Sequence, residues 1–128
     1  MPATIINLTP HPVTVYPSDA PDRIEPGTMT PMRVIPASNE FPPARLGQRA
    51  LPNTLTDIDG VPVERVQFGT DPGCASTLPE TAEGTWYLVA LVVAVAATQR
   101  HDLLVVHDYV RDTQGRIIGC RKLASPHR

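Results

Sequence analysis

The sequence predicts a small α/β domain of the α+β kind, in which a mixed and mostly antiparallel sheet of about five or six short strands carries one packed helix. At 128 residues the chain has room for one core, since domains most often contain about 100 to 150 residues. Hydrophobic residues form 41% of the sequence and charged residues 19%, a composition typical of folded proteins. The fifteen prolines exclude long helices, because proline lacks the N–H that helices and sheets need. We therefore expect a single domain over residues 1–128.

Short β-branched runs predict the strands of the first third of the chain. Residues 5–9 and 13–16 form two extended stretches around a Pro-His-Pro kink, and residues 23–25 and 32–35 follow turn signals. Residues 36–60 contain four prolines and two glycines and have no regular hydrophobic period. We expect them to form a long irregular connection, a kind of loop that is often functional.

The second half of the chain combines strand patterns with one helical pattern. Residues 61–69 alternate as in a strand, and residues 85–89 have the composition of a buried strand. Small residues recur on a helical face over residues 90–97, so we expect a switch from strand to helix near residue 90 and a helix near residues 90–99. The alternative is a long buried strand, because valine favours strands. The predicted core draws on apolar positions of all these elements: Ile5, Leu8, Val13, Val34, Val66, Phe68, Leu88, Leu91, Val92, Val95, Leu104, Val106, Val110 and Ile117.

Charge and hydropathy exclude several classes of partner. The net charge of −2 gives no reason to expect a long nucleic acid or an anionic membrane as partner. The longest apolar run, at residues 87–97, is about half the length that a membrane-spanning helix needs. The first residues lack the pattern of a secretory signal, so we expect a cytoplasmic protein with Cys74 and Cys120 as free thiols.

A basic hairpin is the most informative feature of the sequence. Residues 1–99 carry five Arg and ten acidic residues, whereas residues 100–128 carry five Arg and one Lys against three Asp. A turn signal at residues 112–115 joins a strand that begins at residues 103–106 to its partner at residues 116–121. Closing the hairpin there places three pairs of residues opposite each other: Arg111 and Arg116, Val110 and Ile117, and Tyr109 and Ile118.

The facing arginines predict a place for an anion. Like charges opposite each other across two strands are unfavourable unless solvent separates them or an anion bridges them. Guanidinium groups suit phosphate and carboxylate, so Arg111 and Arg116 are candidate ligands, together with His107 and Tyr109 on the same face. The alternative is a solvated hairpin tip with splayed side chains.

A second candidate site lies near the N-terminus. In an extended strand Asn7, Thr9 and His11 would project from one side, where an amide, a hydroxyl and an imidazole could hold a nucleobase edge or a ribose. The alternative is that the flanking prolines place His11 in a turn. The full set of candidate ligand-binding residues is Asn7, Thr9, His11, Tyr87, His107, Tyr109, Arg111 and Arg116.

Catalytic chemistry has weaker support. His11 or His107 could act as a base, and the predicted hairpin puts His107 opposite Cys120, a candidate nucleophile, with Asp108 or Asp112 as orienting group. No supporting signature surrounds these residues, so no catalytic residue is assigned. The His and Cys residues lack the short spacing of metal sites, and phosphate-binding glycine loops are absent, so neither a metal nor a cofactor is expected.

Three segments together, residues 6–13, 86–89 and 110–120, carry a resemblance. The first has the motif Asn-Leu-Thr-Pro-His-Pro-Val and the last has Val-Arg-Asp, two residues, then Gly-Arg-Ile-Ile-Gly-Cys. They resemble a family of small uncharacterised proteins from actinobacteria and their phages, which has no assigned activity. The resemblance implies a setting in which such proteins sequester a nucleotide signal of host immunity or block a host protein, in a homo-oligomer whose second subunit closes the pocket.

These observations lead to one expected function and two alternatives. The expected function is a non-enzymatic binding protein for a small anionic, nucleotide-like ligand. One alternative is a small hydrolase or transferase that uses His11 or His107. The other is a protein-interaction module that uses the loop at residues 36–60.

Overall fold

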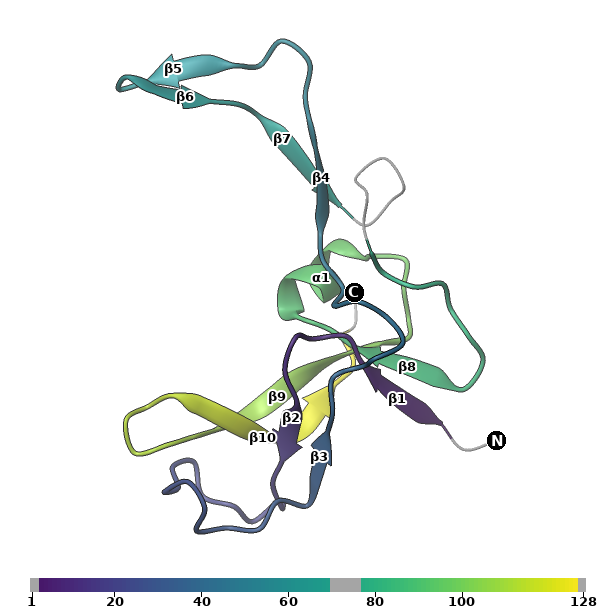
Figure 1. The fold of residues 1–128 in the computed structure, drawn as a ribbon, viewed down its shortest axis with the longest axis vertical. Helices are drawn as coiled ribbons and strands as arrows, with labels where there is room; N and C mark the ends of the chain where they lie inside the picture. The colour runs from purple at the N-terminus through teal and green to yellow at the C-terminus, as the bar shows by residue number, and fades with distance from the viewer. Residues whose placement is uncertain (1–2, 70–76, 127–128) are drawn as a thin grey trace.

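The architecture is that of a small β-rich body with a projecting arm (Figure 1). The computed structural model describes residues 3–69 and 77–126. In chain order the described elements are β1 (Thr4–Asn7), β2 (Val13–Val15), β3 (Arg33–Ile35), β4 (Gly47–Ala50), β5 (Thr56–Ile58), β6 (Val61–Val63), β7 (Val66–Gly69), β8 (Thr85–Leu88), α1 (Leu91–Ala96), β9 (Leu103–Arg111) and β10 (Ile117–Ala124).

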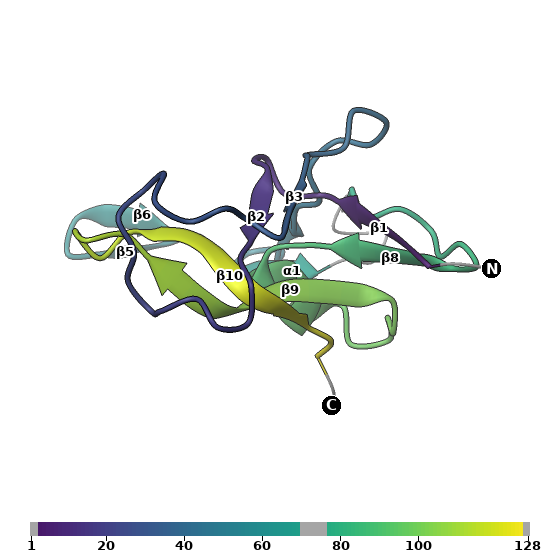
Figure 2. The same ribbon diagram turned by 90° about the horizontal axis from the view of Figure 1, so that it is seen from below.

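The body is built on one six-stranded sheet in the order β1-β8-β9-β10-β2-β3. β1, β8 and β9 run parallel and side by side (Figure 2), and β10 returns antiparallel to β9. β2 pairs in parallel with β10 and antiparallel with β3. A bridge between Asn7 and Ala37 links the end of β1 to the segment after β3, so the sheet nearly closes on itself.

The predicted fold class needs correction. A six-stranded sheet with one helix is confirmed, but the described chain also forms two separate two-stranded sheets and is mostly β rather than α/β. The sheet is also not mostly antiparallel, because β1–β8, β8–β9 and β2–β10 are parallel pairs. Parallel pairing needs a crossover connection, and hydrophobic periodicity does not indicate which distant strands a crossover joins.

The helix begins where the sequence predicts and is shorter than expected. Ala90 is still extended, with ψ of 149°, and α1 follows directly over Leu91–Ala96. The predicted helix over residues 90–99 is therefore confirmed in kind and place. Val93 and Ala94 are its buried residues; they belong to one buried cluster with Leu8, which follows β1, and Leu103 of β9.

Only part of the predicted core is buried. Leu8, Leu88 and Val110 are each at most 1% exposed, and Ile5, Val13, Leu104 and Val106 pack at the edge of the core. Val66 is half-buried. For the remaining residues the prediction of burial is wrong. The predicted core residues that lie exposed are Val34, Phe68, Leu91, Val92, Val95 and Ile117.

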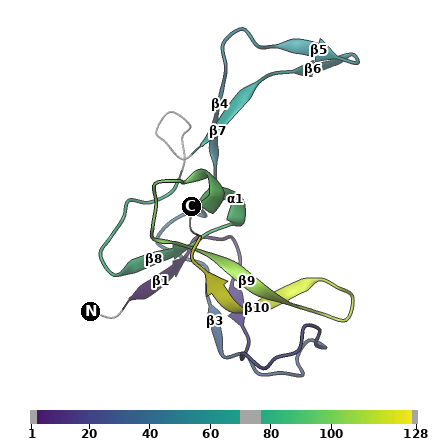
Figure 3. The same ribbon diagram turned by 180° about the vertical axis from the view of Figure 1, so that it is seen from behind.

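The arm, residues 47–69, replaces much of the predicted loop. β4 pairs with β7, and further out β5 pairs with β6, both antiparallel. Asp59 and Gly60 close the tip with φ of 51° and 79°, as a two-residue hairpin turn of type I′ requires. Seen from the front and from behind, the arm stands away from the body with α1 at its base (Figures 1 and 3). The expectation of irregular structure over residues 36–60 is therefore wrong for the part that forms β4 and β5.

Two smaller expectations concern the membrane and the thiols. No helix within residues 3–69 and 77–126 combines the length and the apolar character needed to cross a bilayer. Cys120 is a buried free thiol, as expected. Cys74 lies outside the described residues.

Candidate functional site

The hairpin arginines are engaged by the turn that joins their strands. Asp112 is 3% exposed, and its Oδ1 accepts hydrogen bonds from the backbone N–H groups of Gln114 and Arg116, each at 2.9 Å. The Arg116 Nε donates to Asp112 Oδ2 at 2.9 Å, and the Arg111 Nη1 donates to the carbonyl of Gly115 at 2.9 Å. Hydrogen bonds from Arg116 and Gln114 hold the pKa of Asp112 below its ordinary value. Both guanidinium groups thus have partners within the turn.

The register of this hairpin differs from the predicted one. Ile117 faces Arg111 rather than Val110, and an irregularity between Ile117 and Gly119 then shifts the pairing further, so that Cys120 faces Tyr109. His107 consequently faces Lys122 rather than Cys120, and the predicted pair of base and nucleophile is wrong. Burial raises the pKa of the Cys120 thiol, which keeps it protonated and a poor nucleophile.

The predicted trio of Asn7, Thr9 and His11 side chains is wrong as a binding edge, because the Asn7 amide faces inward and His11 takes part only through its backbone carbonyl. Asn7 is 2% exposed, and its Nδ2 donates to the carbonyls of Ile35 and His11, each at 3.0 Å. Its Oδ1 accepts from the backbone N–H of Thr9 at 2.9 Å and from the Thr9 hydroxyl at 2.6 Å. The amide therefore ties the Pro-His-Pro turn to the end of β3. Tyr87 is likewise buried, and its hydroxyl donates to the carbonyl of Glu80 at 3.1 Å.

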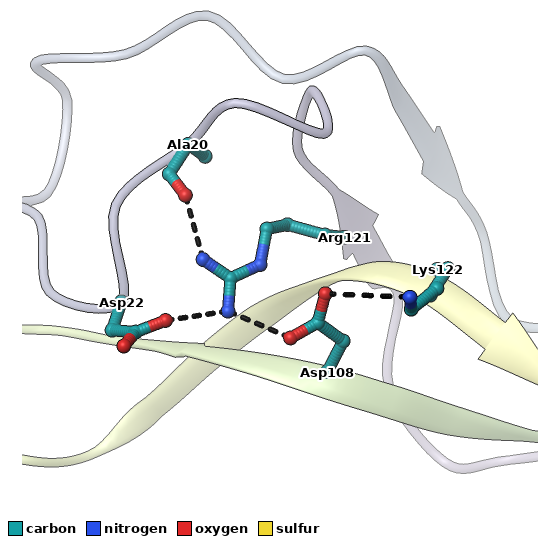
Figure 4. Close-up of polar contacts among 5 residues, drawn as sticks. All are labelled: Ala20, Asp22, Asp108, Arg121 and Lys122. Atoms are coloured by element: carbon teal, nitrogen blue, oxygen red, sulfur yellow. Dashed lines mark hydrogen bonds and ion pairs between the residues drawn. The ribbon is translucent and has the colours of Figure 1, made fainter.

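A network centred on Arg121 is a polar feature that sequence reasoning missed. Its guanidinium donates to the carbonyl of Ala20 at 2.6 Å and to the carboxylates of Asp22 at 2.6 Å and Asp108 at 2.7 Å (Figure 4). Lys122 lies 4.0 Å from the other oxygen of Asp108. The Arg121 side chain is 13% exposed, so the network fastens the loop after β2 onto the hairpin. Asp22 is 99 residues away in sequence, and no local pattern indicates such a pairing.

Because of the Arg121 network, the stability of the fold should vary with pH in the acidic range. The hydrogen bond from Arg121 holds the pKa of Asp108 below its ordinary value near 3.8. A carboxylate with a lowered pKa stabilises the fold above its unfolded-state pKa, and that contribution is lost as the pH falls through the folded-state value. We expect the urea midpoint to fall as the pH drops below about 4, and to fall less steeply in Asp108→Asn. Identical pH dependence in the two proteins would contradict this assignment.

The arm and α1 both expose apolar side chains. On α1, Leu91, Val92 and Val95 are between 57% and 63% exposed, although a helix that is apolar on all sides is normally buried. Where α1 meets β7, a hollow of about 440 Å³ is lined partly by Phe68, Leu78 and Ala97. We call the following residues the apolar surface: Leu51, Leu55, Ile58, Val61, Val63, Phe68, Leu91, Val92 and Val95.

A second hollow opens on the main sheet. It measures about 450 Å³ and is lined by apolar groups of Ile5, Trp86 and Leu104, with Arg33 at its side. Arg33 is exposed at the start of β3, and Trp86 is partly buried in β8. The hollow lies away from the predicted arginines of the hairpin, and neither Arg33 nor Trp86 was among the predicted ligands.

Neither a metal-binding geometry nor a comparison with known proteins identifies the site. Within the described ranges, no group of three or more His, Cys, Asp or Glu residues is placed to hold a metal ion. Comparison with protein-family models, curated proteins and solved structures found no match to this chain. The proposals below therefore rest on the chain's own geometry.

Proposed function

We propose that this protein acts as a protein-interaction module that binds another polypeptide through the arm and α1. The observation that carries the proposal is the apolar surface, whose residues on α1 and at the arm tip are more than half exposed. Apolar patches of this kind on a folded protein mark interaction sites. The proposal corresponds to the alternative that used the loop at residues 36–60, with the site extended to α1.

The outer part of the arm has no packing contacts with the described residues of the body that would stabilise it. All six residues of β5 and β6 are exposed, so neither face of this two-stranded ribbon rests on the sheet. An isolated two-stranded hairpin is at best marginally stable in water. Its outer edges also present unpaired N–H and C=O groups, which another chain can pair with. A polypeptide seated on the arm would satisfy both needs.

A pair of neighbouring substitutions on α1 tests whether this surface is open in the isolated chain. We expect Val92→Lys to change the free energy of unfolding by no more than about 0.5 kcal/mol, because a substitution on an open surface leaves packing intact. The matched variant Val93→Lys should destabilise strongly, because Val93 is 1% exposed and an unpaired charge would be buried. Urea unfolding at low protein concentration measures both. Strong destabilisation by Val92→Lys would mean that the chain covers this face itself, and the proposal would fail.

The hollow beside Trp86 supports a second candidate function, the binding of a small anionic, nucleotide-like ligand. Its volume of about 450 Å³ lies in the range of small-molecule sites, about 300 to 1,000 Å³. The indole of Trp86 offers an aromatic surface for a base, and Arg33 offers a guanidinium for a phosphate. This candidate keeps the ligand class expected from the sequence and moves its anion contact from the hairpin to β3.

Fluorescence of Trp86, the only tryptophan in the sequence, tests the second candidate. We expect a nucleotide, cyclic dinucleotide or ADP-ribose to change the emission saturably. Arg33→Ala should weaken that binding by about 10- to 100-fold, the range for a lost hydrogen bond to a charged group. Arg111→Ala serves as the control and should leave the affinity unchanged. Unchanged emission with all three ligand types would remove this candidate.

A further inference from the structure

We infer that the polypeptide bound by the apolar surface is a second copy of this chain, whose arm crosses to cover α1 while its own α1 receives the first chain's arm. This inference rests on the proposed function and adds the identity of the partner. Three features of the chain support it: the area it exposes, the two halves of its apolar surface, and the charges along its arm.

The chain exposes more surface than a compact monomer of its mass, and the excess is large enough to form a dimer interface. The chain exposes 8753 Å², whereas a compact monomer of 13.9 kDa exposes about 6,700 Å². The excess of about 2,000 Å² is larger than the ~800 Å² that each partner buries in a standard interface. A partner that covers both the arm and α1 would therefore remove surface on the scale of a stable dimer.

The two halves of the apolar surface suit each other. The arm tip projects and carries Ile58 and Val61, while α1 lies at the base of the arm and carries Leu91, Val92 and Val95. A two-fold axis relates the same contacts in both directions, so each tip can seat on the other chain's helix. One arrangement then covers the projecting and the receiving parts of both chains, without a third component.

Charge along the arm is arranged for the same antiparallel crossing. Asp57 and Asp59 lie at the tip, and Arg49 lies in β4 near the base; Arg65, just before β7, follows directly after Glu64, so that part of the arm carries no net charge. When two arms lie antiparallel about a two-fold axis, the acidic tip of each comes beside Arg49 at the base of the other. Such complementarity favours the antiparallel register, because parallel arms would place like charges together.

The test is sedimentation velocity of the full chain, of single variants and of a mixture of two variants. We expect the wild-type protein to form dimers, and Ile58→Lys or Val92→Lys to raise the dimer dissociation constant by at least about thirtyfold, as for a central interface residue. Val34→Lys is the matched control, because Val34 is a valine on β3 that is also about half exposed and lies outside the apolar surface. It should dimerise like the wild type.

Mixing Ile58→Lys with a third variant, Val92→Glu, tests the crossing of the arms. Their heterodimer places two opposite charges together in one arm-to-helix contact, where they offset each other, and leaves the other contact intact. Each homodimer, in contrast, carries one substitution in both contacts. We expect the mixture to dimerise more tightly than either variant alone. A mixture no tighter than its components would overturn the arm-to-helix contact.

A wild-type chain that stays monomeric at every concentration would overturn the second copy as partner. The proposed function is then judged separately by an apolar fluorescent dye and by the Val92→Lys unfolding experiment. If the dye binds and Val92→Lys leaves unfolding unchanged, the surface is open to a different polypeptide. If the dye does not bind and Val92→Lys destabilises the chain, the proposed function fails as well.

Discussion

Leu88→Ala is expected to destabilise the protein by about 2 to 5 kcal/mol, the usual cost of truncating a fully buried leucine. Leu88 is 0% exposed and lies in β8, between Asn7 of β1 and Leu104 of β9. Its side chain belongs to one buried cluster with Val15 of β2, Ile35 of β3 and Cys120 of β10. The truncation would leave a cavity where both halves of the nearly closed sheet meet.

Chemical unfolding of Leu88→Ala and of a matched variant measures this effect. Leu91→Ala removes the same atoms three residues later, but Leu91 is 57% exposed, so in the isolated chain its cost should stay near about 0.5 kcal/mol. Equal losses in the two variants would show that Leu91 is packed within its own chain. That outcome would also count against the open apolar surface.

Gly119→Ala is expected to destabilise the fold by about 1 to 3 kcal/mol through overpacking. A Cβ at this position would lie 2.6 Å from the carbonyl oxygen of Thr14 and 2.7 Å from Cε2 of Tyr16. The carbonyl belongs to β2, so relief requires β2 to move away from β10, where the two strands pair in parallel. The cost therefore falls on the contact that brings β2 and β3 into the sheet.

The neighbouring variant Ile117→Ala provides the control for Gly119→Ala. Ile117 lies in the same strand and is 50% exposed, so its truncation should change the free energy of unfolding by no more than about 0.5 kcal/mol. Thermal or urea unfolding measures both variants. A Gly119→Ala protein as stable as the wild type would mean that β2 and β10 are packed less closely than described.

Local features of the fold were predictable because their causes are local. The turn at residues 112–115 follows from Asp112 and Gly115, and Gly115 does adopt a positive φ of 84°. The helix near residue 90 follows from a run of small residues. The irregular pairing after Ile117 was not predictable from the turn, and the close approach of Gly119 to β2, a strand about a hundred residues earlier, has no local signal.

The candidate site was less predictable, for two physical reasons. Arg116 has a guanidinium group that could bind an anion, but the sequence does not show that this group already forms an ion pair with Asp112. Hydrophobicity indicates that Phe68, Leu91 and Val95 should be buried, and it does not specify whether their own chain or another chain buries them. The residues of α1 and β7 that were predicted to be buried but are exposed therefore mark the apolar surface.

Amide hydrogen exchange at low and high protein concentration is the most direct test of the account. We expect the amides of the arm and of α1 to exchange rapidly in dilute protein, as in a marginal hairpin, and to become protected as concentration rises. The amides of β9 and β10 should show the same protection throughout. Protection of the arm that does not change with concentration would contradict the claim that a second chain covers it.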